Sequence, residues 1–177
     1  EGVADRGIVS PIANSAFSVY KFKLLGSVVD GGIKSYKIQV TPKQSQSPAY
    51  HGVIYIADSS YAVTELDLYV EKQQIQILDS VLVSMTYQPL EGHWVANQSR
   101  MGFVFTFGLL GVKIPFKGYS HSILSAYDLE PDFDKKSFNR EIIAVSDSAL
   151  AKPKLFWDSI RPLPLTQVEI GRASCRE

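Results

Sequence analysis

Residues 62–72 read AVTELDLYVEK, a stretch in which apolar and polar side chains alternate. A β-strand points successive side chains to opposite faces of its sheet, so this alternation predicts a strand with one buried face and one solvent face. The buried face would carry Thr64, Leu66, Leu68 and Val70, and the solvent face Glu65, Asp67, Tyr69 and Glu71. A sheet with one polar face is typical of antiparallel pairing.

The segments on both sides of this stretch also predict strands. Residues 20–29 and 33–41 flank Asp30-Gly31-Gly32, which favours a tight hairpin because glycine adopts positive φ. Further strands are predicted at 53–57, 81–88, 93–107 and 109–127, and one or two helical turns at 152–160. We therefore predict a mostly β fold: a single curved antiparallel sheet, an open half-barrel-like meander of about seven to nine strands with short helical segments.

The length and the residue pattern predict one domain between flanking segments. The chain has 177 residues, close to the roughly 150 that one domain usually takes. We assign 1–14 to an incoming linker, 15–146 to the antiparallel β domain, 147–169 to a short helix with a proline-rich exit segment, and 170–177 to a separate tail. The chain starts without Met, and we interpret it as a fragment of a longer protein.

Composition and charge exclude several classes of protein. Apolar residues make up 45% of the chain and charged residues 20%, which is typical of a globular domain. Lys+Arg and Asp+Glu balance at 18 each, so there is no basic excess that would favour nucleic acid. No apolar stretch is long enough to predict a membrane-spanning helix. The one cysteine, Cys175, lies in the tail, which excludes an intramolecular disulfide and a cysteine-rich zinc site.

No spacing of reactive side chains predicts catalysis. His51, His93 and His121 show no metal-binding spacing, and we interpret them as surface or satisfied histidines. Asp128, Glu130, Asp132 and Asp134 alternate as in a calcium loop, but Pro131 interrupts them and the glycine and final glutamate of such a loop are missing, which favours a solvated turn. We predict no catalytic, cofactor-binding or metal residues and no enzyme activity. Metal-dependent hydrolysis would require the three histidines, or two of them with the acidic segment, to converge.

The most apolar part of the chain is the run MGFVFTFGLLGVKIPF at residues 101–116. Buried strands read as continuous apolar runs, so we favour a pair of core strands around a glycine bend. The alternative is a hydrophobic surface that holds lipid or a partner, or that borders a membrane. An open curved sheet would leave an apolar concavity, with Phe17, Phe22 and Tyr36 near it in the pattern, and such concavities are common ligand sites.

Several phrases of the sequence resemble one protein family. They are PIANSAF at 11–17, YKFKLLG at 20–26, IQVTPK at 38–43, LDLY at 66–69, LD at 78–79, YDL at 127–129 and WDSIRPLPLT at 157–166. The chain resembles the middle domain, of unknown function, of Gram-negative outer-membrane proteins that carry an N-terminal carboxypeptidase-regulatory-like domain and a C-terminal β-barrel. The strand meander is also similar in architecture to lipoprotein-carrier proteins.

The first resemblance implies a location and a partner but no catalytic residues. It implies a non-catalytic module of the cell envelope at the periplasmic face of the outer membrane, with a structural or interaction role. Its partner would be the adjacent β-barrel of the same full-length protein, and a lipid or another envelope protein is a further expectation. The alternative function is binding of a lipid or another hydrophobic ligand in an apolar concavity of the sheet.

The last eight residues resemble a sequence that does not come from a protein. Residues 170–177 read IGRASCRE, which resembles the translation of a common sequencing adapter. We interpret this tail as an adapter artefact and exclude it from the prediction of the fold. Without it the domain has no cysteine and therefore no thiol chemistry.

Overall fold

The computed structural model forms two units, Glu1–Ala126 and Tyr127–Glu177, which are described separately. The structure describes residues 8–44, 49–71, 79–109, 112–133, 148, 151–164 and 166. Residues 72–78, residues 134–147 with Asp134 of the acidic segment, and the tail at 170–177 lie outside these residues. The predicted domain limits of 15–146 stay a prediction.

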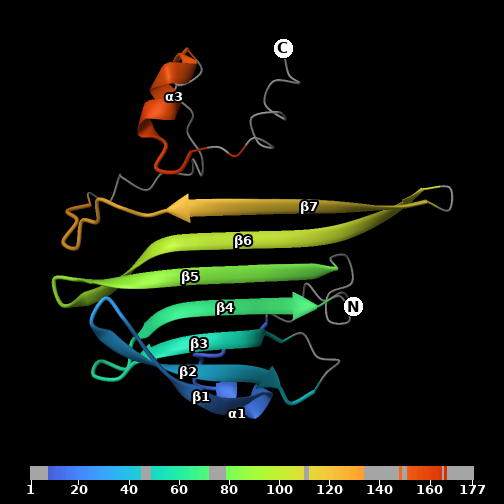
Figure 1. Ribbon diagram of the computed structural model, residues 1–177, viewed down its shortest axis with the longest axis vertical. Coiled ribbons are helices and arrows are strands. Elements are labelled where there is room, and N and C mark those ends of the chain that lie inside the picture. The colour runs from blue at the N-terminus through green and yellow to red at the C-terminus, as the bar shows by residue number, and fades with distance from the viewer. Residues whose placement is uncertain are drawn as a thin grey trace. The chain divides into compact units, whose positions relative to one another are not determined.

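The first unit is one seven-stranded antiparallel sheet in which each strand pairs with its neighbours in the sequence (Figure 1). The strands are β1 (Tyr20–Asp30), β2 (Ile33–Pro42), β3 (His51–Ala57), β4 (Val63–Glu71), β5 (Ser80–Leu90), β6 (His93–Leu109) and β7 (Val112–Ile123). The order β1 to β7 makes a meander that does not close, so β1 and β7 are its two edges. The predicted mostly β fold and open antiparallel sheet are confirmed.

Two-residue turns join the strands of two hairpins. Gly31 and Gly32 connect β1 to β2 with φ values of 53° and 81°, as the sequence predicts. Glu91 and Gly92 connect β5 to β6 with φ values of 49° and 82°. Positive φ at both central residues suits the right-handed twist of paired strands, which explains why such short loops suffice.

One face of the sheet carries the core, and we call it the apolar face. Val40 of β2, Ile54 of β3 and Leu66 and Leu68 of β4 are buried on this face. A short helix, α1 (Ala16–Val19), packs with them through Ala16. The alternation predicted for β4 is confirmed from Leu66 to Val70, because Leu66, Leu68 and Val70 are buried while Tyr69 is exposed. Thr64, predicted on the buried face, is only half-buried. Residues of the opposite, polar face include Gln39, Asp67, Ser84, Gln98 and Arg100, which adjoin one another through the strand pairings.

The second unit contains a helix, α3 (Lys154–Ile160), where the sequence predicts helical turns. Lys152 Nζ lies 4.9 Å from the centre of the Phe156 ring, and Arg161 forms an ion pair with Asp158 at 3.2 Å. These contacts stabilise the two ends of a helix with no buried residues. Among the described residues, no helix has the length and apolar character needed to cross a membrane.

Candidate functional site

An apolar cavity of about 570 Å³ lies between the apolar face of the sheet and the segment that leads into α1. The sheet contributes Phe22, Ile38, Ile54, Ile56 and Val63 to its lining. Residues 11–14 and α1 contribute the other side, which includes Phe17. This volume falls within the range of about 300–1,000 Å³ that small-molecule sites occupy.

Tyr20 holds the covering segment against the sheet. Its hydroxyl donates a hydrogen bond to the Val9 carbonyl and accepts one from the backbone N–H of Tyr50 at 3.1 Å. Burial raises the pKa of the Tyr20 phenol, so the group stays a neutral donor. Lys43 Nζ adds a hydrogen bond to the Phe17 carbonyl at 2.7 Å. The cover is therefore attached at both of its ends, to β1 and to the segment after β2.

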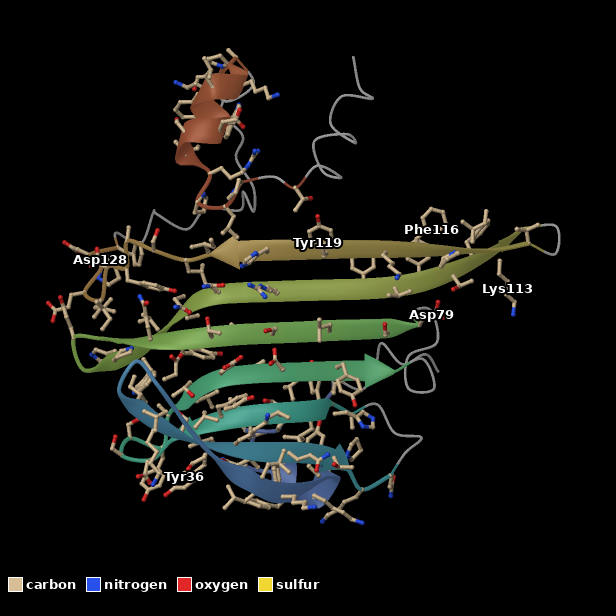
Figure 2. The ribbon with its side chains drawn as sticks, viewed as in Figure 1. Tyr36, Asp79, Lys113, Phe116, Tyr119 and Asp128 are labelled. Atoms are coloured by element: carbon tan, nitrogen blue, oxygen red, sulfur yellow. The ribbon has the colours of Figure 1, made fainter. Side chains whose placement is uncertain are left out.

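Two of the three aromatic residues predicted near a concavity do line this cavity. The rings of Phe17 and Phe22 meet edge to face with centres 5.2 Å apart. Tyr36 (labelled in Figure 2) is half-buried and does not line this cavity; it lies beside Lys34 and Asp58. Hydrogen bonds from Tyr36 and then from Lys34 lower the pKa of the Asp58 carboxyl.

A second, smaller cavity of about 280 Å³ is polar. Six strands line it, from Asp30 at the end of β1 to Trp94 and Gln98 of β6, so the sheet curves around it. Tyr55 and Glu65 also contribute to the lining. No sequence spacing indicates this cavity, because its residues meet only through the curvature of the sheet.

The surroundings of Glu65 in this cavity destabilise its ionised carboxylate. Partial burial, then the nearby carboxylates of Asp67 and Asp30, raise its pKa, and Lys37 acts in the opposite direction. Within the part of the chain that the structure describes, the Glu65 side chain has no hydrogen-bond or ion-pair partner. The ionised form of Glu65 is therefore disfavoured in the folded protein.

We expect Glu65→Gln to stabilise the fold at pH 7 but not at about pH 4. A pKa that is raised on folding adds stability at low pH, and this contribution is lost as the pH rises through the folded-state pKa. The gain at pH 7 should stay below about 1 kcal/mol because water screens a partly exposed group. Urea unfolding at both pH values measures it, with Glu91→Gln in the exposed β5–β6 turn as the control. A variant less stable than the parent at pH 7 would contradict this assignment.

The structure does not bring the three predicted histidines together. The His51 ring stacks on Tyr69 with centres 5.3 Å apart, and His93 is exposed at the start of β6. His121 of β7 accepts a hydrogen bond from Arg100 Nε at 3.4 Å. In the described ranges, no three His, Cys, Asp or Glu side chains lie close enough to hold a metal ion.

The acidic segment forms a local turn. The Asp128 carboxylate accepts a hydrogen bond from the backbone N–H of Glu130 at 3.1 Å. Asp132 is exposed, and Asp134 lies outside the described residues. These contacts fit the predicted solvated turn.

The interpretation of residues 101–116 as core strands is wrong in one respect. The run does form two paired strands, β6 and β7, but Met101, Phe107 and Phe116 are 51%, 52% and 45% exposed. The reason is that α1 and the residues before it cover the apolar face at the core side chains of β1 to β5. The alternative interpretation, a hydrophobic surface, therefore agrees with the structure.

Comparison with known proteins gives one result. The model of a family of unknown function, DUF5686, matches residues 2–127, which include the whole seven-stranded sheet. Neither the curated proteins nor the solved structures contain a significant match to the chain. Because the family model covers more than half of the sequence, the chain belongs to the DUF5686 family of unknown function.

Proposed function

We propose that this domain is a non-catalytic binding module that holds an apolar chain, such as the acyl chain of a lipid, in the cavity between α1 and the sheet. The observation that carries the proposal is the lining of that cavity, which is mostly apolar. Asn14 and the exposed Tyr61 supply polar groups to the lining. A ligand with an apolar body and a polar head fits this distribution.

The expected affinity comes from removing the chain from water. Burial of each CH₂ group contributes about 0.8 kcal/mol before the entropy of immobilisation is subtracted. The cover is short and its attachments are hydrogen bonds from Tyr20 and Lys43, so entry of a ligand requires only a local displacement. Phe17, which is 76% exposed, is one of the lining residues that such a ligand would contact.

We expect the chain to bind a fluorescent long-chain fatty acid and Ile56→Trp to weaken that binding at least about tenfold, which is 1.4 kcal/mol. The indole would fill space in the cavity, because Ile56 is one of its lining residues on β3. Fluorescence titration measures the dissociation constant. Native mass spectrometry of the purified chain reports any lipid that remains bound.

The matched control is Tyr55→Trp, which also adds an indole to β3 but on the opposite face. This variant should bind the fatty acid as the parent does. If both variants lost binding equally, the loss would come from disruption of β3 and not from filling the cavity. Full binding by Ile56→Trp, or no binding by the parent, would contradict the proposal.

We further propose that the module belongs to the cell envelope, at the periplasmic face of the outer membrane beside a β-barrel of the same protein. The sequence phrases at 20–26, 38–43 and 157–166 support this placement. The genomic sequence on both sides tests it, since a barrel of alternating strands should follow in the same frame. A cytosolic enzyme in that position would contradict the placement.

A further inference from the structure

The hairpin of β6 and β7 extends beyond the rest of the sheet (Figure 1). β5 begins at Ser80, which pairs with Val104 of β6. Among the described residues, the pairs from Phe105↔Phe116 to Leu109↔Val112 therefore have no third strand beside them. We call residues 105–109 and 112–116 the ribbon. Figure 2 places Phe116 and Lys113 on this part of the hairpin.

The ribbon is amphipathic. Phe105 pairs with Phe116 and Phe107 pairs with Ile114, which places these four apolar side chains on one face. Phe107, Phe116 and Ile114 are 52%, 45% and 42% exposed. The Phe105 and Phe116 rings stack with centres 5.0 Å apart, so neighbouring side chains of the patch pack against each other. The opposite face carries Thr106, Lys113 and Pro115.

The charged residues in the ribbon and next to it in the sequence are all positive. Residues 103–118 contain Lys113 and Lys117 and no Asp or Glu. Asp79, at the base of the ribbon, accepts a hydrogen bond from Thr106. Two ribbons packed through their apolar faces would turn their four lysines outward, where the second copy offers them no opposite charge. An anionic surface complements both the apolar side chains and the lysines.

We propose that the ribbon docks this protein on an anionic lipid bilayer, with the apolar face of the ribbon at the level of the acyl chains and the lysines among the headgroups. Large exposed apolar patches mark interaction sites. Each lysine near an anionic membrane surface contributes attraction that salt weakens. The proposal does not require a ligand in the cavity under α1.

The depth of this contact is limited by the backbone of the ribbon. Because β7 is an edge strand of the described sheet, its outer backbone groups have no partner strand, and hydrocarbon does not accept such groups. The ribbon should therefore lie along the interface, where amphipathic elements insert by about 5–10 Å. The long side chains of Lys113 and Lys117 can reach the phosphates from the polar face. Peripheral, salt-sensitive binding is the expected behaviour.

Co-sedimentation of the full chain with vesicles tests the proposal. We expect it to bind vesicles that contain phosphatidylglycerol more tightly than vesicles of phosphatidylcholine alone. The double variant Phe107→Ser/Phe116→Ser should lose binding to both kinds of vesicle at least tenfold. Lys113→Glu/Lys117→Glu should remove the preference for phosphatidylglycerol, and so should high salt.

Two controls separate this result from other causes. Tyr119→Ser removes an exposed aromatic ring from the other face of β7 and should bind as the parent does. Ile56→Trp alters the cavity under α1 and should also leave vesicle binding unchanged. Circular dichroism confirms that each variant is folded. The proposal is overturned if the parent fails to bind phosphatidylglycerol vesicles, or if Phe107→Ser/Phe116→Ser binds them as tightly as the parent. It is also overturned if that variant loses self-association and keeps vesicle binding, because the partner would then be a second copy of the chain.

Discussion

Gly52→Ala should abolish stable folding of the sheet, although it adds a single methyl group. Gly52 lies in β3 between Val40 and Leu68, at a φ of 139° that side chains rarely adopt. An added Cβ would lie 2.0 Å from the Asp67 carbonyl oxygen and 3.1 Å from the Leu68 Cα. Both contacts are with backbone, so β4 itself would have to move away from β3.

The expected loss for Gly52→Ala is about 4 kcal/mol or more, a large part of the roughly 5–15 kcal/mol that stabilises a typical domain. Urea unfolding followed by circular dichroism measures it. Gly102→Ala in β6 is the matched control, because its Cβ would meet nothing closer than Leu82 Cβ at 3.7 Å. That change should be neutral or stabilise by up to about 1 kcal/mol. A Gly52→Ala protein about as stable as the parent would contradict the close approach of β4 to β3 at this glycine.

The architecture of the sheet could be predicted because each strand carries a local signal. The alternation in β4 predicts which side chains are buried, and Gly31-Gly32 predicts the first hairpin turn. A meander needs only neighbours in sequence to pair, so no long-range pairing had to be inferred. The strict importance of Gly52 could not be predicted in this way, since the approach of β4 to it appears only in three dimensions.

The two cavities and the ribbon depend on features that periodicity does not encode. An apolar run such as 101–116 has the same sequence pattern whether or not another layer covers it. Here α1 and the residues before it pack on β1 to β5, and side chains of β6 and β7 stay exposed. The exposure of the ribbon follows from register, because β6 and β7 continue after the last pairing with β5. The polar cavity needs curvature to bring Asp30 near Glu65.

Leu68→Asp should unfold the domain or cost it at least about 4 kcal/mol, because it removes packing and buries a charge. Leu68 is 5% exposed on the apolar face and pairs with Val83 of β5 and Gly52 of β3. Loss of the leucine side chain alone, in Leu68→Ala, should cost about 2–5 kcal/mol. The difference in free energy of unfolding between the two variants gives the cost of burying the carboxylate. Urea unfolding of both variants measures this cost and the loss of leucine packing.

The same substitution on the other face provides the control. Leu82 of β5 pairs with Tyr69, the residue next to Leu68, and is 47% exposed. Leu82→Asp introduces the same carboxylate where water can reach it, so its cost should stay within about 1 kcal/mol. Similar losses for the two aspartate variants would mean that both faces of the sheet are buried, for instance against a partner. A small loss at Leu68 with a large one at Leu82 would mean that the faces are reversed, and with them the assignment of the cavity and of the ribbon's apolar face.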